Sequence, residues 1–300
     1  MSLKVLRVFH CHSERAIVTN ALICNNQLIS IDNMGGFYAM DLNTGRSKAI
    51  FCNDAVIFHL TASADGKLAC LTYSMRPGYW NISVYHTDTW VRLYTRPTLI
   101  PDDIAFNNGT DIVLLTTNTN LTVINGLSGA VIKTLAISAS TDMKSHKHKP
   151  WVALKSRDKD CINSHYSIID VSEAIELYRV PITGFMPDTQ AAFLNDDFYM
   201  HTPAGDAYLY DASGRNIIYY YEPSVLIING TLFNADTQDI SVSKIRQRIG
   251  GKMYSADLVM CFYSTMAVGN NILAVVNNTN GVGPKSITLY SLDPKDYVDT

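Results

Sequence analysis

The chain has 300 residues, of which 47% are hydrophobic and 17% are charged, and its formal net charge is −3 at pH 7. A chain of this length buries a core without a disulfide or a metal, and its charge gives no global field that would attract polyanions. No window approaches the roughly 18 apolar residues of a membrane helix, and the N-terminus has no apolar signal segment. We therefore expect a cytoplasmic, intracellular protein that binds no membrane.

Two series of turns recur along the chain. The first series joins pairs of apolar strands through Asn, Asp and Gly, which tolerate the positive φ of tight hairpins. Its members lie near Asn26, Asp65, Gly109, Lys149-Pro150, Asp196, Asn229 and Asn270. The second series follows a strand that ends in Asp or a polar substitute, and lies within 39–46, 84–91, 123–130, 168–175, 209–215 and 289–295. The two series alternate with a spacing of about 40 residues, which is the length of a propeller blade.

The repeat predicts an all-β fold: a seven-bladed β-propeller with four-stranded antiparallel blades. We expect a single domain over residues 1–300, with blades at about 10–52, 53–97, 98–137, 138–182, 183–222, 223–256 and 257–300. Six or eight blades stay open if the sixth is irregular, and a sandwich of hairpins is the alternative architecture. The segments 171–178 and 240–249 could form short helices, but both also fit blade strands.

Some of these residues resemble a known superfamily. Ser63-Ala-Asp-Gly-Lys-Leu-Ala69 resembles the hairpin after the first strand of WD-repeat blades. The segment 84–91 resembles their outer turn, with His86 in place of the expected Asp, and 117–135 is similar to the YVTN-type repeat. The Gly-His and Trp-Asp dipeptides of WD repeats are missing, so the resemblance implies a divergent propeller.

The segment 3–9 precedes the first blade and has the composition of a strand. A propeller closed with strands from both chain ends has no exposed sheet edge there. We expect 3–9 to complete the last blade by pairing near 286–292. The alternative is that 296–300 forms that outer strand and 3–9 is an arm.

Aromatic and basic residues outside the core strands are the candidate interface, because Tyr, Trp and Arg are enriched in binding hot spots. They fall into three groups: Arg76, Tyr79 and Trp80 in an expected loop insertion; Lys144, His146, Lys147, His148, Lys149 and Trp151 in a basic loop; and Arg246 and Arg248. Packing between blades also uses aromatic residues, and a basic loop can be a merely solvated one.

Acidic pairs and histidines are the remaining candidates for chemistry. Asp102-Asp103 and Asp196-Asp197 fit turn positions, and His10 and His12 supply too few ligands for a metal. The six cysteines have no metal-like spacing, so we expect reduced thiols and neither metal nor cofactor. No catalytic motif is present.

These observations favour a non-catalytic scaffold that binds other proteins as a subunit of a larger assembly, a viral one among the options. One alternative is a channel-centred hydrolase or lyase acting on sugars or lactones, with Asp102, Asp103 and His59 at the rim. The second alternative is RNA or polyanion binding through the basic loop at 144–159, which the negative net charge disfavours.

Overall fold

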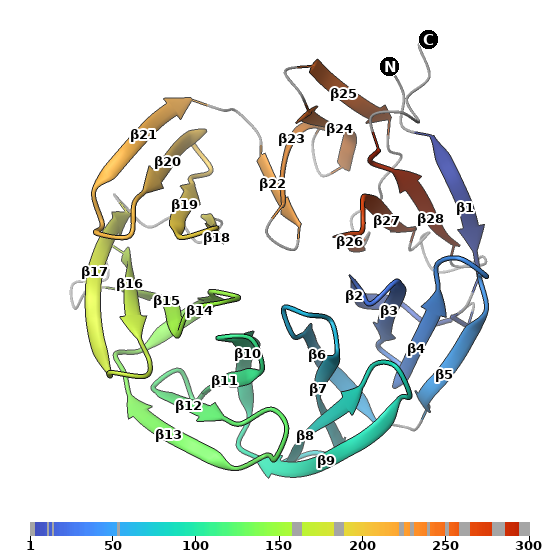
Figure 1. Cartoon of the computed structure of the whole chain (residues 1–300), viewed down its shortest axis with the longest axis horizontal. Coiled ribbons are helices and arrows are strands. Elements are labelled where there is room, and N and C mark those ends of the chain that lie inside the picture. The colour runs from blue at the N-terminus through green and yellow to red at the C-terminus, as the bar shows by residue number, and fades with distance from the viewer. Residues whose placement is uncertain are drawn as a thin grey trace. The chain divides into compact units, whose positions relative to one another are not determined.

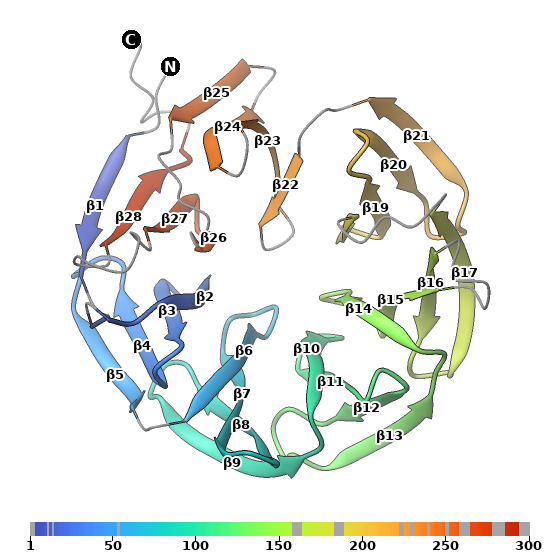
Figure 2. The same cartoon turned by 180° about the vertical axis from the view of Figure 1, so that it is seen from behind.

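In the computed structural model, the described part of the chain consists of strands and turns and contains no helix (Figures 1 and 2). The structure describes residues 4–10, 12–13, 15–52, 55–157, 164–182, 189–221, 225–228, 231–238, 241–249, 252–257, 265–277 and 286–293. The structure does not describe the side chains of Cys52, Tyr220, Thr265 and Asn277, or those of the strands between 225 and 257. None of these residues forms a helix that could span a membrane.

The chain divides into two compact units, and the first combines Met1–Leu60 with Ser224–Thr300. It contains three four-stranded antiparallel sheets. Sheet 1 is β2 (Val18–Cys24), β3 (Gln27–Asp32), β4 (Gly36–Asp41) and β5 (Ser47–Cys52). Sheet 6 is β22 (Val225–Ile228), β23 (Thr231–Gln238), β24 (Ser241–Ile249) and β25 (Lys252–Asp257). Sheet 7 is β26 (Thr265–Gly269), β27 (Ile272–Asn277), β28 (Ser286–Ser291) and β1 (Val5–Phe9).

The second unit is Thr61–Pro223, and β6 crosses into it from the first unit. Sheet 2 is β6 (Val56–Ala62), β7 (Leu68–Arg76), β8 (Tyr79–His86) and β9 (Val91–Thr98). Sheet 3 is β10 (Pro101–Asn107), β11 (Asp111–Thr116), β12 (Asn120–Ile124) and β13 (Val131–Ala136). Sheet 4 is β14 (Ser140–Ser145), β15 (Trp151–Arg157), β16 (Ser164–Asp170) and β17 (Ile175–Ile182). Sheet 5 is β18 (Gln190–Leu194), β19 (Asp197–His201), β20 (Asp206–Tyr210) and β21 (Asn216–Tyr221).

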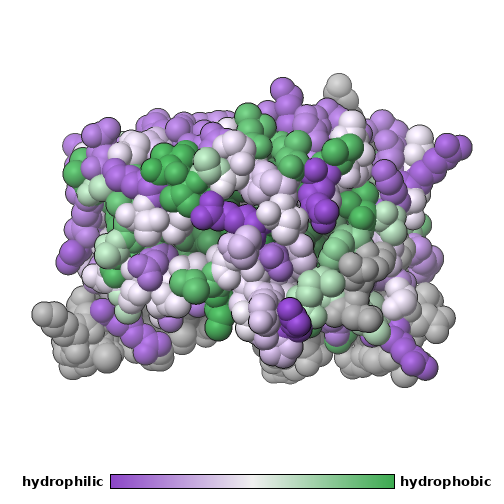
Figure 3. All heavy atoms as spheres, turned by 90° about the horizontal axis from the view of Figure 1, so that it is seen from below, coloured by the Kyte–Doolittle hydropathy of each residue, from purple (hydrophilic) through white to green (hydrophobic). Residues whose placement is uncertain are grey.

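The position of a strand in its sheet determines how much of it is buried. The second strands, such as β7 and β11, are buried on both faces, so they read as nearly continuous apolar runs. The fourth strands, such as β9 and β13, are edge strands and expose most of their side chains. Figure 3 views the molecule from below Figure 1, on the side where β9 and β13 lie. It shows apolar side chains there in separate groups among polar ones.

Apolar clusters join several sheets within each unit face to face. One cluster joins sheets 2 and 3, with Leu68, Ile82 and Phe106 among its members. Two others join sheet 3 to sheet 4 and sheet 4 to sheet 5. In the first unit, a fourth cluster joins sheet 7 to sheet 1. At these four junctions, each sheet buries apolar side chains against the next one.

The N-terminal strand completes sheet 7, which confirms the prediction for residues 3–9. β1 pairs antiparallel with β28, from Val5 opposite Tyr290 to Phe9 opposite Ile287. The sheet order is β1-β28-β27-β26, so the outer position is filled by the strand from the start of the chain.

Members of both predicted turn series are formed, whereas the predicted turn at Asn229 and the end of the one at 289–295 lie outside the described residues. Asn25 and Asn26 have φ of 45° and 56°, and Asn270 and Asn271 have φ of 52° and 55°, as a two-residue hairpin turn requires. In the second series, Asp41, Asn125, Asp170 and Asp211 each accept hydrogen bonds of 2.6–3.2 Å from backbone N–H groups and one Ser or Thr hydroxyl of their own turn. These side chains replace the pairing that the chain loses when it reverses direction.

A glycine in several of these second-series turns lies under a ring from another sheet of the same unit. Gly129 has φ of +73°, and an added Cβ would lie 2.9 Å from the Tyr94 ring. Gly214, with φ of +81°, has the same relation to Tyr178 at 2.6 Å. Glycine is needed at both positions because it allows the left-handed conformation and also the close approach of the ring.

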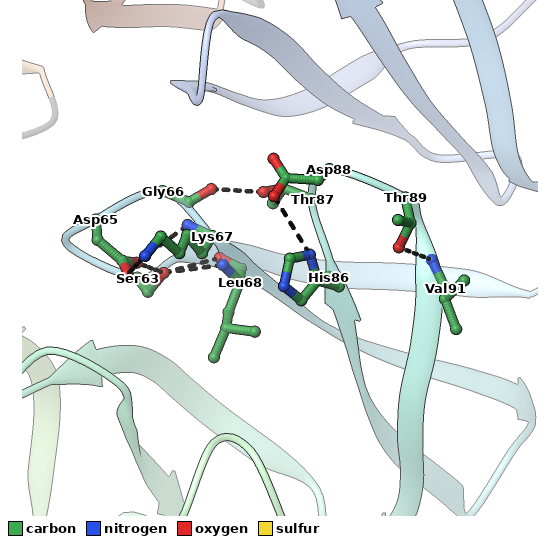
Figure 4. A network of polar contacts seen from close by, with 10 residues as sticks. All are labelled: Ser63, Asp65, Gly66, Lys67, Leu68, His86, Thr87, Asp88, Thr89 and Val91. Carbon is green, nitrogen blue, oxygen red and sulfur yellow. Dashed lines mark hydrogen bonds and ion pairs between the residues drawn. The ribbon is translucent and has the colours of Figure 1, made fainter.

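Sheet 2 departs from this pattern at its second turn. Trp90 takes the left-handed position with φ of 56°, which is unusual for a bulky residue, and its N–H donates to the His86 carbonyl at 2.7 Å. The buried His86 Nδ1 has no hydrogen-bond partner, and the nearest carboxylate oxygen, from Asp88, is 3.8 Å away (Figure 4). The first turn of the sheet supports this one, because Thr87 Oγ1 donates to the Gly66 carbonyl at 2.7 Å.

Candidate interaction surface

The β7–β8 hairpin ends in a tight turn at Pro77-Gly78, across which Arg76 pairs with Tyr79. Proline with a fixed φ followed by Gly78 at φ of +84° is the combination of a type II turn. The strand register shifts between Ser74 and Arg76, and Ser74 Oγ donates to the Arg76 carbonyl at 2.7 Å. The segment expected as a loop insertion is therefore an extension of two strands with a stiff end.

Aromatic, cationic and apolar side chains gather at this end of sheet 2. The Arg76 guanidinium lies 4.2 Å from the centroid of the Tyr79 ring. Thr98 at the end of β9 pairs with Trp80, so the residues after Thr98 come to the same end of the sheet as Tyr79. We define the hairpin patch as the exposed residues Met75, Arg76, Tyr79, Leu99 and Ile100, whose apolar members are 50–62% exposed. Trp80 is half-buried beside it.

The β14–β15 turn, the centre of the predicted basic loop, is held by groups from sheets 3 and 5. The Asn107 amide nitrogen at the end of β10 lies 2.9–3.3 Å from Ser145 Oγ and the carbonyls of His146, Lys149 and Trp151. His146 Nδ1 accepts the N–H groups of His148 and Lys149, each at 3.0 Å. Burial lowers the pKa of His146, which keeps the ring neutral and able to accept both bonds.

Two lysines of this loop are paired with carboxylates. Lys149 Nζ lies 2.9 Å from Asp196 Oδ2 and 4.1 Å from the centroid of the Trp151 ring. Lys144 Nζ lies 2.7 Å from Asp142 Oδ1. Lys147 and His148 are exposed at the tip of the turn. The loop therefore presents less unpaired positive charge than its sequence indicates.

Arg246 and Arg248, the third predicted group, belong to strand β24. Their side chains lie outside the described residues, so the structure does not relate them to the other two groups. The hairpin patch and the basic loop come from different sheets, sheet 2 and sheet 4.

The adjacent carboxylates Asp102 and Asp103 differ in burial: Asp102 is exposed and Asp103 is half-buried. Asp102 is exposed and its Oδ2 accepts the Asn118 N–H at 2.6 Å, which supports the β11–β12 turn. Burial raises the pKa of Asp103 to about 6, an effect partly offset by the Lys144 charge. Asp142 also raises the pKa of Asp103, and Asp142 itself accepts the Tyr166 hydroxyl at 2.9 Å.

A Ser-His-Asp arrangement is buried in sheet 1. His12 Nε2 lies 2.7 Å from Ser30 Oγ, and its Nδ1 lies 2.7 Å from Asp32 Oδ2. Asp32 Oδ1 accepts the N–H groups of Met34 and Gly36 at 2.9 and 2.7 Å. The distances match those of a nucleophile, base and orienting acid. However, the His12 and Asp32 side chains are only 0% and 3% exposed, so no substrate reaches them and the network stabilises the turn after β3.

The remaining candidate ligands and nucleophiles, the histidines and cysteines, do not form a cluster among the described residues. Among the described residues, no group of three or more His, Cys, Asp or Glu side chains is arranged to hold a metal. His10 is exposed whereas His12 is buried, and Cys11 lies outside the described residues. His59, on β6, is half-buried. Cys24 and Cys70 are buried free thiols, and burial raises the pKa of Cys24 to about 12.

Neither a protein-family model nor a curated protein matches the sequence. Solved structures do match its fold. One is titled "Structure of U3-55K", with a TM-score of 0.67 at 12% identity, covering 95% of this chain and 98% of the other. Another is titled "Crystal Structure of Mitotic Checkpoint Complex", with a TM-score of 0.65 at 9% identity, covering 97% of this chain and 96% of the other.

The fold is a β-propeller built from four-stranded antiparallel sheets. The sheets are the blades of this propeller, and β1 is the strand that completes the last blade. At 9–12% identity the likeness concerns the fold and does not transfer a function.

Sequence reasoning missed the buried network of the first blade. It treated His12 as part of a solvated or metal-like triplet, because the partners Ser30 and Asp32 are distant in the sequence. A signal was present: a Ser and an Asp two residues apart at the end of a strand share one face. Such a pair needs a third buried polar group, and His12 supplies it.

Proposed function

We propose that this propeller is a non-catalytic scaffold that binds other proteins as a subunit of a larger intracellular assembly, of which a viral assembly is one kind. The observation that carries the proposal is the contrast between its polar networks and its exposed turns. The Ser30–His12–Asp32 network is buried and saturated with hydrogen bonds. The exposed β7–β8 end instead carries Arg, Tyr and Met, residue types enriched at protein interfaces.

Affinity purification of the tagged chain from its native source, followed by mass spectrometry and cross-linking, tests the proposal. We expect a reproducible set of protein partners, with cross-links to the exposed turns of the blades. Elution of the chain alone, at the mass of a single copy, would contradict it.

A channel-centred enzyme is the second candidate function, and Asp103 is the observation in its favour. A carboxyl whose pKa is raised to about 6 could act as a general acid or base near neutral pH. The charged groups that act on it are Lys144 and Asp142, and Asp142 already binds both Lys144 and the Tyr166 hydroxyl. Assays with sugar and lactone substrates on the wild-type chain and the Asp103→Asn variant decide this candidate: hydrolysis that the variant loses would favour the enzyme.

Binding of polyanions through the basic loop has weaker support than the sequence indicated, because Lys144 and Lys149 are paired with carboxylates. A salt titration of RNA binding tests it. Affinity for a polyanion that contacts several cations falls steeply as salt rises, whereas an affinity independent of salt would remove this candidate.

A further inference from the structure

The β7–β8 hairpin presents a cation and an aromatic ring as a single recognition unit. The Arg76 Cζ lies over the Tyr79 ring, 4.2 Å from its centroid, and among the described residues Arg76 makes no ion pair. A guanidinium that stacks flat on a ring keeps its N–H edge available to a partner. That edge is the part that binds a carboxylate with two parallel hydrogen bonds.

Large apolar side chains are exposed at the same end of the sheet as this pair. Tyr79, Leu99 and Ile100 are 58%, 62% and 57% exposed, and the nearby Met75 is 50% exposed. The register of β8 with β9 brings the 99–100 segment to the end of the sheet where Tyr79 lies. Exposed apolar groups clustered beside a charge are the usual mark of an interaction site.

The backbone beneath these side chains is held in one conformation. Pro77 has little freedom in φ, and Ser74 Oγ fixes the bulge at Met75 through its bond to the Arg76 carbonyl. Bulges re-aim side chains, and a stiff hairpin loses little conformational entropy when a partner binds.

We propose that the hairpin patch docks a protein segment that carries a carboxylate flanked by large apolar side chains. This inference rests on the proposed scaffold function and specifies the chemistry of one partner. The carboxylate pairs with Arg76, and the flanking side chains cover Tyr79, Met75 and Leu99. Charge then sets the orientation of the segment, while apolar burial supplies most of the affinity.

Two other occupants fit the patch less well. A nucleic acid strand binds through several cations along its backbone, whereas the patch has one arginine among four apolar side chains. In a contact with a second copy of this chain through the patch, each Arg76 would meet a patch that holds another arginine and no carboxylate. Like charges in such a contact repel each other.

Selection from a random 12-residue peptide library displayed on phage tests the inference, with the full chain as bait. The selected peptides are then measured by fluorescence anisotropy against the wild type and against Arg76→Glu, Arg76→Lys and Tyr79→Ser. Val131→Ser is the matched control, because Val131 is 42% exposed on a different edge strand. A 12-nucleotide single strand serves as the competing probe.

We expect the selected peptides to be enriched in Asp or Glu next to Leu, Ile or Phe. Their affinity falls about tenfold or more in Arg76→Glu and Tyr79→Ser, less in Arg76→Lys, and stays unchanged in Val131→Ser. Unchanged circular dichroism and thermal midpoints show that the variants are folded. Peptides without acidic enrichment, equal binding by wild type and Arg76→Glu, or tighter binding of the oligonucleotide at the hairpin would each overturn the inference.

A parallel purification from the native source separates this inference from the proposed function. Partners that co-purify equally with the wild type and Arg76→Glu leave the scaffold function standing and contradict docking at the hairpin patch. The absence of any partner with the wild type contradicts the scaffold function itself, whatever peptides the library yields.

Discussion

Replacing Gly129 by alanine tests whether the contact between a ring and a turn stabilises the packing of neighbouring blades. Gly129 has φ of +73°, and an added Cβ would lie 2.9 Å from the Tyr94 ring of the preceding blade. Gly109 is the matched control, because its φ is +85° and nothing lies within 4 Å of its added Cβ. Both variants place alanine in the left-handed conformation, which costs roughly 1–2 kcal/mol.

Only Gly129→Ala must also displace a packed ring. Overpacking of this kind costs roughly 1–3 kcal/mol, so we expect Gly129→Ala to be more destabilising than Gly109→Ala by about that amount. Urea unfolding followed by tryptophan fluorescence measures the difference in midpoint, provided that the slopes agree. Adding Tyr94→Ala should bring Gly129→Ala close to the cost of the control, because the displaced ring is then gone. Equal midpoints for the two glycine variants would refute the reasoning.

Three further predictions concern single side chains. Asp103→Asn should stabilise the chain at pH 7 by at most about 3 kcal/mol, because the pKa is raised to about 6 and ionising the buried carboxyl costs stability. The gain should shrink as the pH falls from about 6 toward the ordinary value of 3.8, and a gain independent of pH in urea midpoints would contradict it. His86→Asp should restore the acceptor found in the other second-series turns and stabilise the turn by about 1 kcal/mol; a lower thermal midpoint would exclude this. Asn107→Ala removes a buried donor to the β14–β15 turn and should cost roughly 1–3 kcal/mol, with faster amide exchange at Lys149 as its local signature.

The repeat was readable from the sequence because its turns depend on local chemistry. Asp41 and Asn125 hold their turns through their own side chains, and Asn25-Asn26 supplies the positive φ of a hairpin without help from distant residues. The completion of the last blade by β1 was also predictable, because an edge strand without a partner is costly.

Features that depend on contacts between blades were not readable in the same way. The basic run 144–149 looked like free positive charge, but Lys149 meets Asp196 of the next blade and Asn107 of the previous blade holds the turn. The extension around Pro77-Gly78 looked like a loop because Pro and Gly often mark loops, whereas strand pairing continues to Arg76 and Tyr79. In both cases a partner distant in sequence decides the outcome.

The pairing of β1 with β28 has a consequence for biosynthesis. The ribosome makes β1 before the other strands of the propeller, yet its partner β28 follows more than 270 residues later, so the seventh blade is completed only after β28 has been translated. Contacts between segments this far apart form slowly, because the intervening chain must first be ordered. During that interval the β1 strand has neither edge paired, and a nascent chain that stalls before 286 would keep an open β-strand available for association with other chains.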